Sequence, residues 1–223
     1  MKKKSAFTMI ELVFVIVILG ILSSLAMGRM DRDLEQEAAN TILSHIRLTQ
    51  QLALNDNKHR VVHDDKWQQA YWRFEYGKCR RVDAYYYRVG SDVDRNGKIK
   101  KNESAINPSN GKYLYTSNTC DNLANNESPT VLLGKKFGIR NITGLGSCNK
   151  VKHIAFDYLG RPHHQLASYA QADFSKYIYK NCRLRFEMST DINNDGEINI
   201  EDSFNIIIES ETGHAYIEGQ EDS

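Results

Sequence analysis

Hydrophobic residues are concentrated at the start of the chain, in a nearly unbroken apolar stretch from residue 7 to residue 27. A helix rises about 1.5 Å per residue, so this stretch is long enough to cross a hydrocarbon core of about 30 Å. Between residues 28 and 57 the pattern changes, and apolar residues recur at spacings of three and four. This spacing predicts an amphipathic continuation of the same helix. Its apolar stripe comprises Leu34, Ala38, Ile42, His45, Ile46, Thr49, Leu52 and Ala53.

After residue 57 the chain consists of short segments rich in β-branched and aromatic residues, separated by polar, Asn-rich connections. This pattern is typical of β-strands, and no alternation of strands with helices follows it. We therefore expect an α+β fold, in which a long N-terminal helix packs on an antiparallel β-sheet head. The predicted strands are 61–62, 67–76, 84–89, 151–157, 177–187, 204–209 and 214–217.

The charges on either side of the apolar stretch predict its orientation. Lys2, Lys3 and Lys4 precede it, whereas charges of mixed sign follow it. The positive-inside rule then places the N-terminus in the cytoplasm and the head outside. An ordinary secretory signal peptide is the alternative, because Ser23, Ser24 and Ala26 could mimic its cleavage site.

Glu11 interrupts the apolar stretch, where an ionised carboxylate costs about 2.5–3.5 kcal/mol on insertion scales. A cationic partner at the same depth would offset this cost. If a peptidase cut before Phe7, the new amino group would lie four residues before Glu11. In a staggered bundle, Glu11 of one subunit could then pair with the terminus of its neighbour.

The sequence MKKKSA followed by FTMIELVFVIVILGILSSLA resembles the leader and first helix of type IV pilins and type II secretion pseudopilins. The resemblance implies cleavage between Ala6 and Phe7 by a prepilin peptidase, methylation of Phe7 and a role for Glu11 in assembly. Ala6 stands where the family most often has glycine. The implied partners are other pilin or pseudopilin subunits, the prepilin peptidase, the inner membrane and an assembly platform.

A second segment, HIAFDYLGRPH at residues 153–163, resembles a motif of H-type minor pseudopilins and related minor pilins. Its physical sense is a strand that buries Ile154 and Phe156 and then turns at Gly160 and Pro162. A generic strand and turn is the alternative interpretation. Together with the leader, the segment favours a minor subunit over a major one.

The head contains the four cysteines, Cys79, Cys120, Cys148 and Cys182. Their even number suits two disulfides in an oxidising compartment, and four cysteines allow three connectivities. No pair has the CxxC spacing, so a zinc site is poorly supported.

Residues 92–103, DVDRNGKIKKNE, fit the calcium-loop pattern D-x-[DN]-x-[DN]-G-x5-E. Calcium takes six to eight oxygen ligands, which carboxylates alternating around a glycine turn can supply. Ile99 is expected to tether the loop to the sheet. The predicted ligands are Asp92, Asp94, Asn96, the Lys98 carbonyl and Glu103.

Residues 191–202, DINNDGEINIED, repeat the pattern and end in Asp202 in place of glutamate. We expect Ca²⁺ to order both loops as a structural cofactor, weakly, at the roughly 0.1–1 mM typical of extracellular modules. A solvated acidic turn is the alternative for each loop. The predicted ligands here are Asp191, Asn193, Asp195, the Glu197 carbonyl and Asp202.

These features predict a non-enzymatic filament subunit of a type II secretion pseudopilus or a type IV pilus. It would be a single-pass protein of the bacterial inner membrane with a periplasmic head or, in a pilus, part of an extracellular filament. The expected parts are the leader (1–6), the transmembrane and assembly helix (7–27), the amphipathic continuation (28–57) and the head (58–223).

The alternative is a DNA-uptake or adhesion pilin whose head binds a ligand, for which tyrosines and arginines between residues 71 and 88 could stack on single-stranded DNA. Nucleic acid is nevertheless not an expected partner, because loss of the three leader lysines changes the formal net charge from +1 to −2. A membrane-anchored enzyme is opposed by the absence of a recognisable catalytic motif. His153, His163 and His164 are expected to be exposed turn residues rather than metal ligands.

Overall fold

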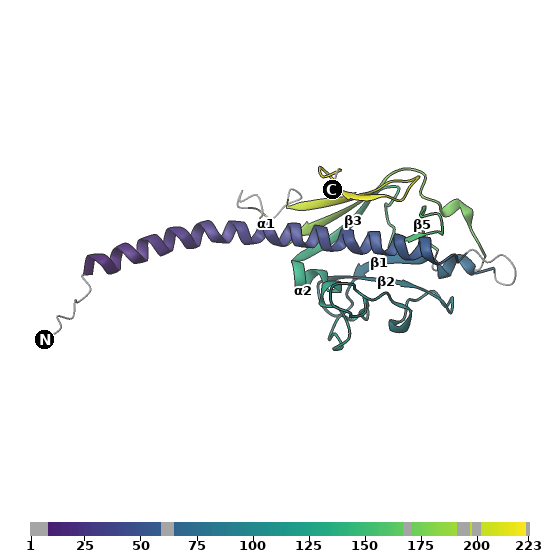
Figure 1. The fold of residues 1–223 in the computed structure, drawn as a ribbon, viewed down its shortest axis with the longest axis horizontal. Coiled ribbons are helices and arrows are strands. Elements are labelled where there is room, and N and C mark those ends of the chain that lie inside the picture. Colours follow the sequence, from purple (N-terminus) through teal and green to yellow (C-terminus); the bar gives the residue numbers. More distant parts are fainter. Residues whose placement is uncertain (1–8, 59–64, 167–170, 191–196, 198–201, 222–223) are drawn as a thin grey trace.

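The computed structural model describes the backbone of residues 9–58, 65–166, 171–190, 197 and 202–221, and the side chains of this part except those of residues 24–33. A 47-residue helix, α1 (Met9–Asn55), projects from a head that is built around its second half (Figure 1). Two four-stranded sheets form most of the head. The predicted α+β class is therefore confirmed.

The second half of α1 is buried in the head. Its buried apolar side chains are Ala38, Ala39, Ile42, Leu43, Ile46 and Ala53. This face includes four positions of the predicted stripe, because residues three and four apart in a helix share one side. Strands of both sheets contact it, so the helix and the sheets share one hydrophobic core.

The first sheet has the strand order β2-β1-β4-β5, and all neighbouring strands are antiparallel. Phe74 on β1 lies opposite Val89 on one side and Ile154 on the other. All three side chains are fully buried and face α1. The strand bounds are β1 (Trp72–Lys78), β2 (Tyr85–Ser91), β4 (His153–Phe156) and β5 (Pro162–His164).

The second sheet has the order β3-β6-β7-β8 and is also antiparallel throughout. Phe186 and Phe204 lie opposite each other and stack with their ring centroids 5.1 Å apart. The strand bounds are β3 (Ile139–Gly146), β6 (Cys182–Met188), β7 (Ser203–Ile208) and β8 (Ala215–Ile217). A short helix, α2 (Leu133–Phe137), precedes β3, and 3-10 turns cover 67–70, 101–103, 129–131 and 174–176.

The strands differ from the prediction in three places. β3 and β5 were not predicted, and residues 67–70 form a 3-10 turn in place of a strand. The remaining predicted strands are present with shifted ends, except that residues 61–62 lie outside the described part. The head thus contains two sheets where the sequence predicted one.

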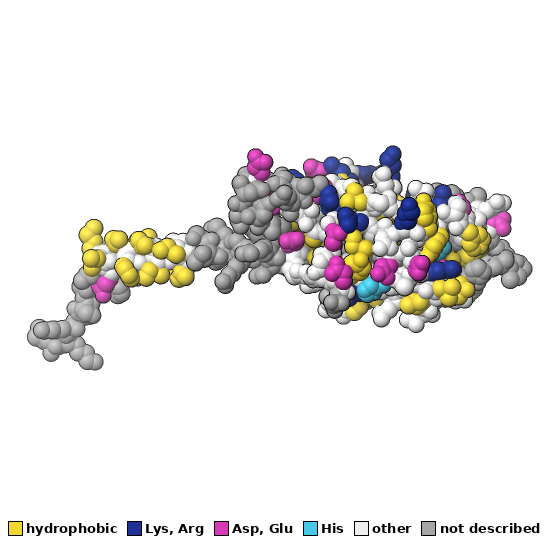
Figure 2. Space-filling view, turned by 90° about the horizontal axis from the view of Figure 1, so that it is seen from above, with side chains coloured by type: hydrophobic (Ala, Val, Ile, Leu, Met, Phe, Trp, Pro, Cys, Tyr) yellow, Lys and Arg dark blue, Asp and Glu magenta, His cyan; other side chains and the backbone are white. Residues whose placement is uncertain are grey.

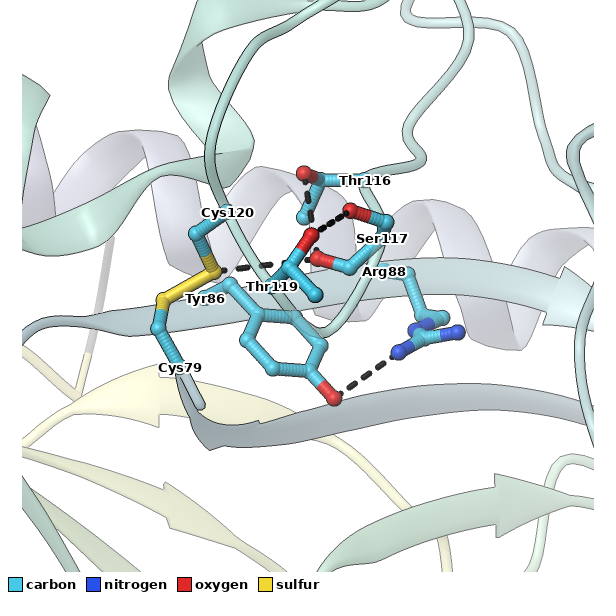
Figure 3. The surroundings of a disulfide bond; sticks show 7 residues. All are labelled: Cys79, Tyr86, Arg88, Thr116, Ser117, Thr119 and Cys120. Atoms are coloured by element: carbon cyan, nitrogen blue, oxygen red, sulfur yellow. Dashed lines mark hydrogen bonds between the residues drawn. A yellow bond between two sulfur atoms is a disulfide. The ribbon is translucent and has the colours of Figure 1, made fainter. Parts of the chain in front are cut away.

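Two disulfides join parts of the head that are distant in sequence. Cys79, directly after β1, bonds to Cys120 (Figure 3). Cys148 in the turn after β3 bonds to Cys182 at the start of β6. These pairs select one of the three connectivities that the sequence left open. Each bond closes a chain separation of 41 or 34 residues, which reduces the conformational freedom of the unfolded chain.

The turn between β4 and β5 is organised by Asp157. Its Oδ1 accepts hydrogen bonds from the backbone N–H groups of Leu159 (3.0 Å) and Arg161 (2.9 Å). Its Oδ2 lies 2.8 Å from Arg161 Nε and 3.2 Å from His163 Nε2. Gly160 has φ +81°, and its carbonyl oxygen accepts a hydrogen bond from Gln50 Nε2 of the helix at 2.9 Å. This turn therefore fixes the end of α1 on the first sheet.

The expectation that the three histidines are exposed is wrong for two of them. His153 and His163 are 6% and 4% exposed, and His164 is partly buried. The Nε2 atom of His153 accepts a hydrogen bond from the Leu166 N–H at 3.0 Å. They are buried because β4 and β5 pair with each other, which places the turn residues inside the sheet.

Candidate functional site

The described beginning of α1 exposes apolar side chains on all sides (Figure 2). Between Met9 and Leu22 its large hydrophobic residues are 42% to 85% exposed, although a soluble helix of this composition would be buried. Glu11 lies in the first turn of the described helix and is also exposed. An apolar surface of this extent requires another apolar environment to cover it.

Over the described residues, no helix is both long enough and apolar enough to cross a membrane.

The predicted cleavage and methylation residues Ala6 and Phe7 lie outside the described residues, as do the side chains of residues 24–27, which end the predicted membrane segment.

The predicted calcium loop 92–103 directly follows β2 and packs against it. Ile99 is 2% exposed, as expected for the residue that tethers the loop. A Cβ atom on Gly90 would lie 2.5 Å from Ile99 Cγ2 and 2.7 Å from the Glu103 carbonyl oxygen, so only glycine permits this close approach. Gly97 has φ +87° at the sharp turn of the loop. The motif therefore forms a compact loop on the sheet, without flanking α-helices.

Three of the five predicted ligands of this loop come together. Side-chain oxygens of Asp92, Asp94 and Glu103 lie within 4.8 Å of one another. Two oxygens bound to one calcium ion at 2.3–2.6 Å can be at most about 5 Å apart, so this donor set fits calcium. Asn96 Oδ1 instead accepts a hydrogen bond from the Lys98 N–H at 3.0 Å.

Backbone N–H groups hold two of the carboxylates in place. Asp92 accepts from Asn96 N (3.1 Å) and Gly97 N (2.7 Å). Glu103 accepts from the backbone of Asp94 (3.2 Å) and of Lys100 (2.9 Å). The fold thus orients these acidic side chains toward one point before any ion binds.

Positively charged side chains lie next to the carboxylates of this loop. The ammonium group of Lys100 contacts Asp94 Oδ2, and its hydrogen bond holds the pKa of Asp94 below the usual range. Burial raises the pKa of Asp92, although the nearby Arg73 guanidinium acts in the opposite direction. A calcium ion would compete with Lys100 for Asp94 and would supply the positive charge that the buried Asp92 carboxylate favours.

A chain of alternating charges continues inward from Asp92. The fully buried Arg73 lies 3.8 Å from Asp92 and 3.4 Å from Glu75, and Arg88 Nε lies 3.4 Å from the other oxygen of Glu75. No sequence pattern predicts this arrangement, because Arg73 reads as one residue of an aromatic strand. The signal in the sequence is the arginine itself, which stands between aromatic residues of a predicted strand. A charged residue that becomes buried in such a strand requires a partner.

Most predicted ligands of the second loop, namely Asp191, Asn193 and Asp195, lie outside the described residues. Glu197 is described and exposed, and Asp202 is fully buried directly before β7. Burial, with a smaller contribution from the Asp202 charge, raises the pKa of Glu35 on α1. The end of this loop therefore lies close to the helix.

Comparison with known proteins gives one match. Residues 1–27 match the family model of the prokaryotic N-terminal methylation motif. No curated protein and no solved structure matches the chain significantly.

Proposed function

Because residues 1–27 mark this chain as a type IV pilin-like protein, we propose that it is a non-enzymatic structural subunit of a type II secretion pseudopilus or a type IV pilus. The observation that carries the proposal is the methylation motif at the start of a helix with two different halves. One half exposes apolar side chains and contains Glu11, and the other forms part of the head core. Such a helix can join its neighbours without unfolding the head.

The motif implies processing by prepilin peptidase and assembly with other pilin subunits. We infer that the peptidase cuts between Ala6 and Phe7 and that Phe7 is methylated. Residues 7–27 then hold the protein in the inner membrane, with the N-terminus on the cytoplasmic side and the head in the periplasm. An assembly platform in that membrane would draw the subunit into the filament.

Glu11 is the proposed assembly residue. A carboxylate among apolar side chains is costly in the bilayer, and pairing with the positively charged Phe7 terminus of a neighbouring subunit reduces this cost. In a staggered bundle the contact would also set the relative height of two subunits. The exposed apolar side chains from Met9 to Leu22 supply the surrounding packing.

The mass of the protein extracted from membranes tests the processing. We expect a chain that begins at Phe7 and carries one methyl group. A full-length mass would mean a plain membrane anchor, and a start near residue 27 would mean an ordinary signal peptide. Either result would remove the basis for a filament subunit.

Incorporation into filaments tests the assembly residue. Glu11→Gln is expected to abolish incorporation while leaving processing intact, because the amide keeps the size but lacks the charge. Glu37→Gln is the matched control, since Glu37 is an exposed carboxylate on the same helix at the head. Equal incorporation of both variants would exclude pairing through Glu11.

We further propose that Ca²⁺ orders the head through the loop 92–103 and, by sequence similarity, through 191–202. The support is the convergence of Asp92, Asp94 and Glu103 within 4.8 Å and their fit to calcium. Bound calcium would neutralise carboxylates that otherwise repel one another. The detergent-solubilised full chain should therefore melt at a lower temperature in chelator than in millimolar calcium, and an unchanged melting temperature would contradict the proposal.

The DNA-binding alternative is weakened by the burial of most of the side chains on which it rested. Tyr71, Tyr86 and Tyr87 are 4%, 7% and 0% exposed, so their rings are not available for bases to stack on. Arg73 and Arg88 are buried beside Glu75. Arg80 and Arg81 remain exposed, but two arginines alone give only weak attraction to a nucleic acid.

A further inference from the structure

A groove runs along one side of the head, between the first sheet and β3. Two adjoining hollows, of about 850 and 690 Å³, share Glu75, Arg80, Tyr86, Gly97 and Asn118 and thus form one continuous depression. We name it the β1–β3 groove. Its walls are formed by parts of the segments 75–80, 85–88, 96–100, 115–118, 142–144 and 149–153.

The charge of this groove differs from that of the whole chain. Seven lysine and arginine side chains line it, against a single carboxylate, Glu75, which already faces Arg73 and Arg88. Four of these cations form no ion pair with any described residue. They are Arg80, Lys98, Lys150 and Lys152. Because the processed chain has an excess of acidic residues, this concentration of positive charge is local.

One cation is built into the groove wall. Arg88 is only 8% exposed, and its Nη2 donates to the Tyr86 hydroxyl at 2.8 Å (Figure 3). The guanidinium carbon lies 4.9 Å from the centre of the Tyr86 ring and 5.5 Å from that of Tyr115. Its Nε atom is buried and forms no hydrogen bond among the described residues. It lies 3.4 Å from Glu75 Oε1, which already faces this charge, so the cations open to a ligand are the exposed lysines and Arg80.

The neighbouring wall is held in place by the first disulfide. Cys120 bonds to Cys79, and the backbone N–H of Arg80 donates to the Asn118 carbonyl at 2.8 Å. Ser117 lines the same hollow as Tyr86 and Arg88, and its hydroxyl group forms a hydrogen bond with that of Thr119 at 2.8 Å (Figure 3). The donors of this wall are therefore positioned before a ligand arrives, which lowers the entropic cost of binding.

We propose that the β1–β3 groove binds an acidic segment of a partner polypeptide. Carboxylates match the unpaired lysines and Arg80, and the amides of Asn118 and Asn149 line the same groove. Single-stranded nucleic acid would carry enough charge, but it needs rings for bases to stack on. The Tyr76 and Tyr86 rings are 6% and 7% exposed, and Tyr85 and Tyr115 are partly buried, so the groove offers little stacking surface. An extended acidic peptide requires only the charges and donors that are present. This surface is separate from the assembly helix, so the proposal stands or falls independently of the filament function.

Binding of a fluorescein-labelled octaglutamate peptide to the detergent-solubilised full chain, followed by anisotropy, tests the proposal. The Lys150→Gln/Lys152→Gln variant is expected to bind about tenfold more weakly than the unchanged protein. Both lysines are exposed, so the variant should melt at the same temperature. The control is Lys135→Gln/Lys180→Gln, which removes the same charge from exposed lysines outside the groove and should bind normally.

Three outcomes would overturn the proposal. The peptide could fail to bind, or both double variants could weaken binding equally, which would show attraction without a site. The third is tighter binding of an oligothymidylate of the same length, lost in the groove variant alone, which would assign the groove to nucleic acid.

Discussion

At the residue scale, the ammonium group of Lys100 and a calcium ion would compete for the carboxylate of Asp94. It pairs with Lys100, and it is one of three acidic groups that fit a calcium ion. We expect Lys100→Gln to bind calcium roughly two- to fivefold more tightly, because the ion no longer displaces an ammonium group from Asp94. Calcium titration followed by melting temperature measures this change.

Lys98→Gln is the matched control for that variant. Lys98 is exposed in the same loop and carries the same charge, but the ammonium group that pairs with Asp94 is that of Lys100. If both variants change calcium affinity equally, the effect is one of general charge. In that case the contact between Lys100 and Asp94 does not limit binding.

His153 makes the stability of the head depend on pH. Burial lowers its pKa from 6.5 to about 3, and its Nε2 must stay unprotonated to accept the Leu166 N–H. In the unfolded chain the His153 imidazole takes up a proton near pH 6.5, whereas in the folded head it stays neutral down to about pH 3. The contribution of neutral His153 to the free energy of unfolding is therefore fully present above pH 6.5 and is lost as the pH falls toward 3. The slope approaches about 1.4 kcal/mol per pH unit for this one group.

Denaturant unfolding of the full chain between pH 7 and pH 4.5 measures the slope. His153→Gln, whose amide oxygen can accept the same hydrogen bond, is expected to show a shallower slope than the unchanged protein. His45, whose pKa is also lowered by burial, would still contribute in both. Identical slopes would mean that His153 does not titrate in this range.

At the element scale, the side chain of Gln50 connects α1 to two turns of the head. Its side-chain amide donates to the Gly160 carbonyl (2.9 Å) and to the Thr212 carbonyl (2.7 Å), and so joins α1 to the turns before β5 and β8. Gln50→Ala should lower the free energy of unfolding by about 1–3 kcal/mol, because two hydrogen bonds between elements are lost. Urea unfolding measures this difference.

Gln51→Ala is its control, since Gln51 is the next helix residue and is exposed. Alanine is the best helix former, so this variant should be neutral or slightly more stable. A similar loss for both variants would attribute the effect to the helix itself and not to its contacts with the turns.

The sequence predicted the elements with strong periodicity better than the others. The stripe along α1 is buried as expected, because its spacing of three and four follows helix geometry directly. β3 was missed because Gly144 and Gly146 interrupt its apolar residues. β5 was missed because it has only three residues, of which the first is a proline. The strands β6, β7 and β8 were predicted, but their separation from the first sheet depends on long-range strand pairing, which a local pattern does not show.

The candidate calcium loop was predictable in more detail than its surroundings. A short motif specifies Asp92, Asp94 and Glu103, and the loop brings their oxygens together. The pairing of Asp92 with Arg73 and the choice of disulfides depend on contacts between distant strands. Such contacts have no local signature in a single sequence.

At the scale of the whole molecule, the two halves of α1 should respond differently to the same substitution. Ile42 is fully buried between the sheets, so Ile42→Ala is expected to cost about 2–5 kcal/mol of head stability. Ile18→Ala, in the exposed apolar half, should change it by less than about 0.5 kcal/mol. Thermal unfolding of the solubilised full chain, followed by circular dichroism and tryptophan fluorescence, measures both.

Coincidence of the two signals is part of this prediction. Trp67 and Trp72 lie in or beside the first sheet, whereas circular dichroism reports on both sheets and the helix. Because α1 and the sheets share one core, the signals should change at one temperature. Separate transitions would show that the second sheet is stable without the helix.

The shared core also determines how the head carries mechanical load. A pull directed along α1 enters the head through a helix that contacts both sheets from Ala38 to Ala53. Arg47 bonds this helix to the Ala215 carbonyl of β8, and Gln50 bonds it to the turns at Gly160 and Thr212. Such a pull must slide the helix past all these contacts at once, in shear, and cannot peel them apart one at a time. A force applied to the exposed first half of α1 is therefore resisted by the helix and both sheets at the same time.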